Sequence, residues 1–142
     1  MSRLSILFSA ILAMTSVAAP ARAPEDKPGT ILMFGARWCT PCMVEYRDLP
    51  GLVAAAAPDH VVLGWIDRPV SPPSRVRGDV QSLPSGEARR LARDAVGDGY
   101  GLPISVLLDG AGHVCAIWHA PLHASDLAAF RAQCARSRPS VD

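Results

Sequence analysis

The chain has 142 residues, a length that fits one domain and leaves no room for two separate cores. Hydrophobic residues make up 49% and charged residues 19%, which excludes a disordered chain or an acidic tail. The formal net charge is +1, without a block of lysines or arginines, so we expect no nucleic-acid partner. Four cysteines are too few for a disulfide-dense miniature scaffold, and their spacing does not fit a four-ligand zinc site. The composition therefore indicates a small globular protein.

The amino terminus has the order of a secretory signal peptide. A short, positively charged start precedes an uncharged apolar stretch from Leu4 to Ala19. Small residues follow, and Ala21–Ala23 has the form of an A-x-A cleavage site, with a second candidate at Ala19–Ala21. The stretch is shorter than the roughly 20 residues that span a bilayer as a helix, although an uncleaved anchor stays an alternative. We therefore expect residues 1–23 to be a signal peptide and residues 24–142 to be an exported domain without a membrane span.

Apolar patterning predicts strands and helices along the rest of the chain. Short, continuous apolar runs are typical of strands that are buried on both faces of a sheet. These runs are Thr30–Gly35, Val61–Ile66, Ile104–Leu108 and Val114–Trp118. The last two runs are joined by the turn Asp109–Gly112 and should form a hairpin. Helical patterns cover Cys39–Ala57, Glu87–Val96 and Ser125–Ala135.

Three local signals refine this pattern. Pro50–Gly51 should kink the first helix or divide it in two. Ser85 is the expected N-cap of the second helix, and Gly97 stands just past its end. Residues 68–84 hold four prolines and are predicted to form a loop. The order of elements predicts an α/β fold, with a central mixed sheet flanked by helices on both faces.

The chemistry concentrates between Trp38 and Cys42, where the sequence is Trp-Cys-Thr-Pro-Cys. Two cysteines three positions apart at the start of a helix can close a small disulfide ring. The unpaired N–H groups and the positive end of the helix stabilise a thiolate on the first cysteine. We therefore expect Cys39 to attack a partner disulfide and Cys42 to resolve the mixed disulfide. Pro41 fits the first turn, where its missing N–H costs nothing.

A cysteine pair with this spacing can also bind a metal or haem, or form a purely structural disulfide. Half of a zinc site would need a second pair of Cys or His ligands, which the spacing does not supply. A c-type haem site would need His after Cys42, where this chain has Met43. A structural disulfide and a soft-metal site, in which Cys39, Cys42 and Met43 hold an ion such as Cu(I), stay open alternatives.

The segment Phe34–Cys42, the step Leu102–Pro103–Ile104 and the final strand–turn–strand–helix order resemble the thioredoxin superfamily. The resemblance runs from Ile31 to Phe130. It implies a thioredoxin fold and thiol–disulfide exchange at Cys39 and Cys42, without an organic cofactor or a metal. It also implies that Pro103 follows a cis peptide bond beside the cysteines. The implied substrate groove consists of Trp38, Thr40, Pro41, Leu102 and Pro103.

Within that superfamily, the export signal and the Pro-Cys-x-x-Glu pattern ending at Glu45 resemble the periplasmic TlpA-like branch. The chain departs from cytosolic thioredoxins at two positions, where Met33 and Leu63 stand in place of a buried Asp and a nearby Lys. How Cys42 loses its proton is therefore open. Arg47 replaces a proline five residues after the motif, and Arg68–Pro84 is longer than the usual connection.

The remaining cysteines, Cys115 and Cys134, could form a structural disulfide. Cys115 is expected in the last strand, on the face of Ile117, and Cys134 shares the apolar face of the closing helix with Leu127. Two buried free thiols are the alternative. The four histidines show no metal-ligand spacing on a helix, and His119 is expected in a solvated loop.

Together these features predict an exported thiol–disulfide oxidoreductase that acts as a reductant. Its expected partners are Cys-containing proteins and an upstream dithiol or disulfide donor, and the protein is expected to be a monomer. The alternatives are an oxidant of folding proteins and a copper chaperone or binding module.

Overall fold

The structure is a computed structural model, and it describes residues 27–137. Five strands form one sheet in the order β3-β2-β1-β4-β5. The strands are β1 (Thr30–Gly35), β2 (His60–Trp65), β3 (Val80–Ser82), β4 (Ile104–Leu108) and β5 (Val114–Trp118). β2 is parallel to β1 and β3, whereas β4 is antiparallel to β1 and to β5. The predicted mixed central sheet is confirmed.

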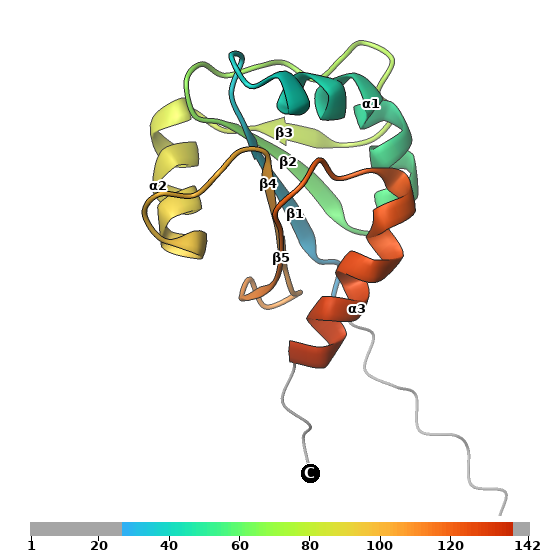
Figure 1. The fold of residues 1–142 in the computed structure, drawn as a ribbon. Coiled ribbons are helices and arrows are strands. Elements are labelled where there is room, and N and C mark those ends of the chain that lie inside the picture. The colour runs from blue at the N-terminus through green and yellow to red at the C-terminus, as the bar shows by residue number, and fades with distance from the viewer. Residues whose placement is uncertain (1–26, 138–142) are drawn as a thin grey trace, which may run out of the picture.

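Helices cover both faces of this sheet, as predicted. They are α1 (Thr40–Ala56), α2 (Ser85–Val96) and α3 (Leu127–Ser137), with a short 3-10 turn η1 (Ala124–Asp126) before α3. Figure 1 shows α1 and α3 on one side of the sheet and α2 on the other. Alternate residues of β1 face the two sides, so Ile31 and Met33 join the core with α1 and α3. Leu32 and Phe34 join the core with α2.

The first helix is continuous, so the alternative that Pro50–Gly51 divides it is wrong. Pro50 lies inside α1 and deprives the helix of one backbone donor. The buried residues around it are apolar and pack on the sheet: Leu49, Leu52, Val53 and Ala56. Since most helical stability in a protein comes from packing of such a face, this packing outweighs the lost hydrogen bond.

The segment Arg68–Pro84 is not loop throughout, because β3 lies within it at the edge of the sheet. Two short hydrogen bonds fold the segment back on itself and on α1. The Tyr46 hydroxyl donates to the Ser71 carbonyl at 2.5 Å, and the Ser82 hydroxyl donates to the Val70 carbonyl at 2.5 Å. The helix that follows begins at Ser85 with Pro84 as its N-cap, so the prediction of Ser85 as N-cap is also wrong.

A β-bulge changes the face on which Cys115 lies. Leu107 pairs with Ala116 and Leu108 pairs with Val114, so Cys115 is the extra residue of β5. Cys115 packs against the core of α1 and α3, whereas Ile117 packs against the core of α2. The prediction that these two side chains share a face is therefore wrong, because simple alternation along the strand does not hold across a bulge.

The predicted signal peptide at residues 1–23 lies outside the described residues. Within residues 27–137, no helix combines the length and the apolar character that crossing a membrane requires.

Candidate active site

The Cys39–Cys42 pair lies where β1 passes into α1. The two sulfurs are joined in a disulfide with an S–S distance of 2.07 Å. Cys39 is the N-cap of α1 with extended backbone, and its sulfur accepts a hydrogen bond from the Cys42 N–H at 3.3 Å. The helix end thus directs a backbone donor at the Cys39 sulfur, the arrangement that stabilises a thiolate at a helix N-terminus.

The expected groove residues fall into an exposed group and a buried group. Trp38 has 70% of its surface exposed, and Thr40 and Pro41 are also exposed. On the buried side, Leu102 and Ile66 pack against a small cluster of Ala36, Cys39 and Cys42. The Leu102–Pro103 peptide bond is cis, and Pro103 is buried. The structure therefore brings Leu102 against the cysteines, while Trp38 stands out beside them.

Glu45 is a buried carboxyl group on α1, only 4% exposed. Its Oε1 accepts a hydrogen bond from the Leu122 N–H at 2.8 Å. The pKa of Glu45 is raised from 4.5 to about 7, because burial raises it by more than the Leu122 N–H and, more weakly, the nearby Ser105 hydroxyl lower it. The Ser105 hydroxyl makes no hydrogen bond of regular geometry within the described residues, so we assign it the smaller effect. Glu45 is therefore a carboxyl group that titrates near neutral pH.

Glu45 and Cys42 line the same small pocket, which has a volume of about 10 Å³. This is about the volume that one water molecule needs. Met33 and Leu63, the positions at which the superfamily resemblance implies a missing Asp–Lys pair, line it as well. The pocket beneath Cys42 thus has a carboxyl group, but that group comes from the helix instead of the first strand.

In the sequence, Glu45 stands out as the last residue of the Pro-Cys-x-x-Glu pattern, which alone assigns it no role. The signal was its spacing, because residues three positions apart on a helix lie on the same face. Cys42 and Glu45 are both buried on α1, and Leu49 continues this face. A glutamate between apolar positions of a helical face that packs on the sheet therefore indicates a buried carboxyl group.

Gly35 allows β1 to approach the cysteines closely. A Cβ atom at this position would lie 3.2 Å from the Cys42 Cβ and 3.5 Å from its sulfur. The absence of a side chain at Gly35, the last residue of β1, therefore leaves space for the Cys42 side chain.

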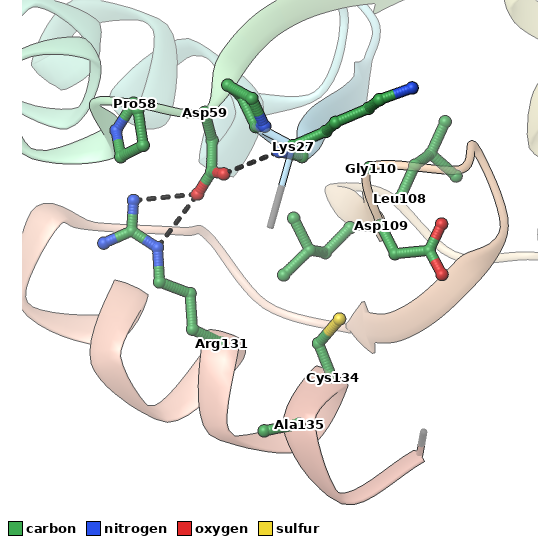
Figure 2. Close-up of a pocket in the computed structure, with 12 residues that line it drawn as sticks. Lys27, Pro58, Asp59, Leu108, Asp109, Gly110, Arg131, Cys134 and Ala135 are labelled. Carbon is green, nitrogen blue, oxygen red and sulfur yellow. Dashed lines mark hydrogen bonds and ion pairs between the residues drawn. The ribbon is translucent and has the colours of Figure 1, made fainter. Parts of the chain in front are cut away.

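The second cysteine pair is bridged in the structure, with Cys115 on β5 and Cys134 on α3. Cys134 also lines a pocket of about 280 Å³ at the other end of β1. Figure 2 shows Arg131 reaching from α3 to Asp59 beside this pocket. The Arg131 Nη2 lies 2.8 Å from the Asp59 carboxylate, which also accepts the Gly29 N–H at 2.9 Å. These contacts tie α3 to the start of β1, away from Cys39 and Cys42.

The described residues supply no further cluster of metal-binding side chains beside Cys39 and Cys42. No group of three or more His, Cys, Asp or Glu side chains there could hold an ion. His119 is exposed, as expected.

Comparison with known proteins relates the fold to solved structures. No protein-family model matches the sequence, and no curated protein matches it. StoA from Bacillus subtilis aligns with a TM-score of 0.54 and 18% identity over 76% of this chain and 85% of its own. A thioredoxin-family thiol:disulfide interchange protein from Chlorobium tepidum aligns with a TM-score of 0.53 and 20% identity, over 75% and 79%. A DsbF homologue from Corynebacterium diphtheriae aligns with a TM-score of 0.52 and 18% identity, over 74% and 71%.

At such identities the likeness establishes the fold. The sheet order, the helices on both faces and the cysteine pair after β1 agree with it. The fold implied by the sequence resemblance is confirmed, and the chain has the thioredoxin fold.

Proposed function

We propose that the protein is an exported thiol–disulfide oxidoreductase that reduces disulfides of protein partners through Cys39 and Cys42. The observation that carries this proposal is the Cys39–Cys42 disulfide at the N-terminus of α1, where the Cys42 N–H is directed at the Cys39 sulfur. The neighbouring Trp38, which is exposed, and Leu102, which is partly buried, supply two walls for an extended, Cys-containing segment.

The exchange takes two steps and moves two electrons to the partner. The Cys39 thiolate of the reduced protein attacks one sulfur of the partner disulfide, and the other partner sulfur leaves as a thiolate. The Cys42 thiolate then attacks the Cys39 sulfur of this mixed disulfide. The second partner thiolate leaves, and the Cys39–Cys42 disulfide remains.

The second step requires that Cys42 lose a proton in a buried environment, since Cys42 is only 2% exposed. Glu45 is the carboxyl group that shares a pocket with Cys42, and its pKa of about 7 suits a proton acceptor near neutral pH. We assign Glu45 this role, directly or through one water molecule in the pocket.

The charges around the sulfurs support the reducing direction. A dithiol couple is a strong oxidant when its thiolate form is strongly stabilised. Neither Thr40 nor Pro41, which separate the cysteines, carries a positive charge. The ionised Glu45 carboxylate, buried near Cys42, disfavours a thiolate there. Arg37, Arg68 and Arg89 have the opposite effect, but all three are exposed, so the surrounding salt solution screens their charges.

Export is proposed from the sequence pattern at residues 1–23. The bridge between Cys115 and Cys134 supports this proposal, because disulfides persist in oxidising compartments. Intact-mass analysis from the native host should find a chain that begins between Ala19 and Glu25. A full-length chain retained in the membrane fraction would contradict the cleavage.

The reduction potential of the Cys39/Cys42 couple tests the proposed activity and its direction. We expect a value nearer the roughly −270 mV of thioredoxin than the roughly −120 mV of a strong oxidant. A value near the second figure would reverse the direction of electron flow. A Cys39→Ala variant should lose all exchange, and stoichiometric retention of copper by the reduced protein would favour the metal alternative.

A further inference from the structure

The backbones of two arginines near the cysteines are held by the same carboxylate. The Asp67 carboxylate accepts the Arg37 N–H at 3.0 Å through one oxygen and the Arg68 N–H at 2.8 Å through the other. Asp67 thereby holds the turn before Trp38 against the end of β2. Both arginine side chains are exposed, so the two cations leave the surface at neighbouring points next to the active-site turn.

A third arginine reaches the same place from α2. The Arg89 Nη1 donates to the Ile66 carbonyl at 3.1 Å. Ile66 in turn packs against the cluster that contains Cys39 and Cys42, and its N–H donates to the Gly35 carbonyl at 2.9 Å. We call Arg37, Arg68 and Arg89 the arginine rim.

The arginine rim has an excess of positive charge. None of its three side chains forms an ion pair with another described residue. The Asp67 carboxylate lies among them, and its two oxygens are occupied by backbone N–H groups. Glu87, which precedes Arg89 on α2, pairs with Arg90 at 3.9 Å instead. Three cations therefore face one carboxylate at this corner of the molecule.

Exposed apolar side chains precede and follow the two cysteines in the chain. Trp38 is 70% exposed, Met43 41% and Val44 36%, although large apolar residues are usually buried. Met43 and Val44 follow Thr40 at helical spacing, so they form a stripe on α1 that begins at the cysteines. The active-site turn thus carries exposed apolar side chains as well as exposed arginines, and aromatic residues and arginine are both enriched in protein-binding patches.

We propose that this surface recognises acidic partner segments, in which aspartate or glutamate residues flank the reactive cysteine. The proposal rests on the proposed function, since it names the substrate class of that exchange. The apolar side chains contact the partner near its cysteine, and the arginine rim attracts the flanking carboxylates. Charge complementarity of this kind raises the local concentration of the partner at the active site, and with it the bimolecular rate of exchange.

The test uses three peptides of equal length, each with one cysteine activated as a mixed disulfide with thionitrobenzoate. The residues flanking the cysteine are glutamate, glutamine or lysine. Reduced full-length protein is mixed with each peptide, and released thionitrobenzoate is followed by its absorbance. At about 20 mM ionic strength we expect the glutamate peptide to react about tenfold faster than the lysine peptide. At about 0.5 M the ratio should fall below about twofold, because salt screens exposed charges.

Two variants separate the rim from the net charge of the protein. The double variant Arg37→Glu, Arg68→Glu should make the lysine peptide react faster than the glutamate peptide. The ratio of these two rates is the readout, because a change in the reactivity of Cys39 itself alters both rates alike. Arg136→Glu is the control, since it makes the same charge change as either of these substitutions alone, near the end of α3 (Figure 1). It should leave the ratio unchanged.

The possible results separate a failure of the acidic preference from a failure of the proposed exchange activity. Equal rates for the three peptides, or faster reaction of the lysine peptide, would overturn the acidic preference and leave the exchange activity standing. An equal loss of preference in Arg136→Glu would also overturn it, because net charge would then explain the effect. Failure of the wild-type protein to react with any peptide would overturn the proposed function and the inference together.

Discussion

Replacement of Glu45 by glutamine should change how the stability of the protein depends on pH. Glutamine has nearly the shape of glutamate and keeps an oxygen that can accept the Leu122 N–H. It removes only the ability to ionise. Since Glu45 is buried and titrates at about 7, its charged form is unfavourable in the folded protein.

Linkage between protonation and folding determines whether Glu45 makes the protein more or less stable as the pH rises. The pKa of Glu45 is about 7 in the folded protein and 4.5 ordinarily, so the folded state binds more protons between these values. The stability that the protonated carboxyl gives is complete below pH 4.5 and is lost as the pH rises through about 7. At about 1.36 kcal/mol for each pH unit, the total loss is about 3 kcal/mol. Glu45→Gln should therefore be more stable than wild type by up to this amount at pH 8.

Urea unfolding of both proteins in oxidised form, at a series of pH values from about 4 to 8, measures this difference. Subtracting the two curves removes contributions from the four histidines, which titrate in the same range. The variant should also resolve mixed disulfides more slowly, by about 10²-fold if Glu45 accepts the Cys42 proton. A difference in stability that does not vary with pH would refute the argument, because Glu45 would then have an ordinary pKa. An unchanged resolution rate would refute its catalytic role alone.

Two further predictions concern the cysteines and their backbone support. In the reduced protein at about pH 7, iodoacetamide should alkylate Cys39 much faster than Cys42, and Cys42→Ala should trap mixed disulfides; equal alkylation rates would contradict these roles. Gly35→Ala should cost about 1–3 kcal/mol and slow exchange, because its Cβ would press on Cys42. Gly51→Ala, on an open part of α1, should instead add up to about 1 kcal/mol and leave exchange unchanged.

The fold was predictable because its strongest signals are local. The apolar run at Thr30–Gly35 marks the central strand, since both faces of β1 are buried. The cysteine motif marks the start of α1, and the turn Asp109–Gly112 marks the hairpin of β4 and β5. Each of these signals lies within about ten residues of the element that it predicts. The family resemblance added the thioredoxin fold to these local signals.

The missed features depend on contacts between distant parts of the chain. β3 has only three residues, none of them fully buried, so its pattern does not stand out from the proline-rich segment around it. The bulge at Cys115 depends on the pairing of β4 with β5, which no single strand reveals. The properties of Glu45 depend on Leu122, which lies 77 residues further along the chain. The spacing of residues along a helix indicates which side chains share a face. Which residues of other elements pack on that face becomes known only from the fold.

The same long-range contact links the second disulfide to the active site. Cys115 and Cys134 close a loop that contains Leu122, the donor that hydrogen-bonds Glu45. Replacing both cysteines by alanine should cost about 3 kcal/mol through loop entropy. It should also loosen the Leu122 N–H, and since that hydrogen bond lowers the pKa of Glu45, the pKa should rise further.

Two measurements follow this effect of Cys115→Ala, Cys134→Ala. Urea unfolding gives the loss of stability, and the pH midpoint of mixed-disulfide resolution gives the change at Glu45. The midpoint should move upward, because a higher pKa delays the formation of the carboxylate that accepts the Cys42 proton. A loss of stability with no movement of the midpoint would show that the disulfide holds α3 on the sheet without positioning Leu122. The hydrogen bond would then be fixed by the local packing of Leu122, which is itself 1% exposed.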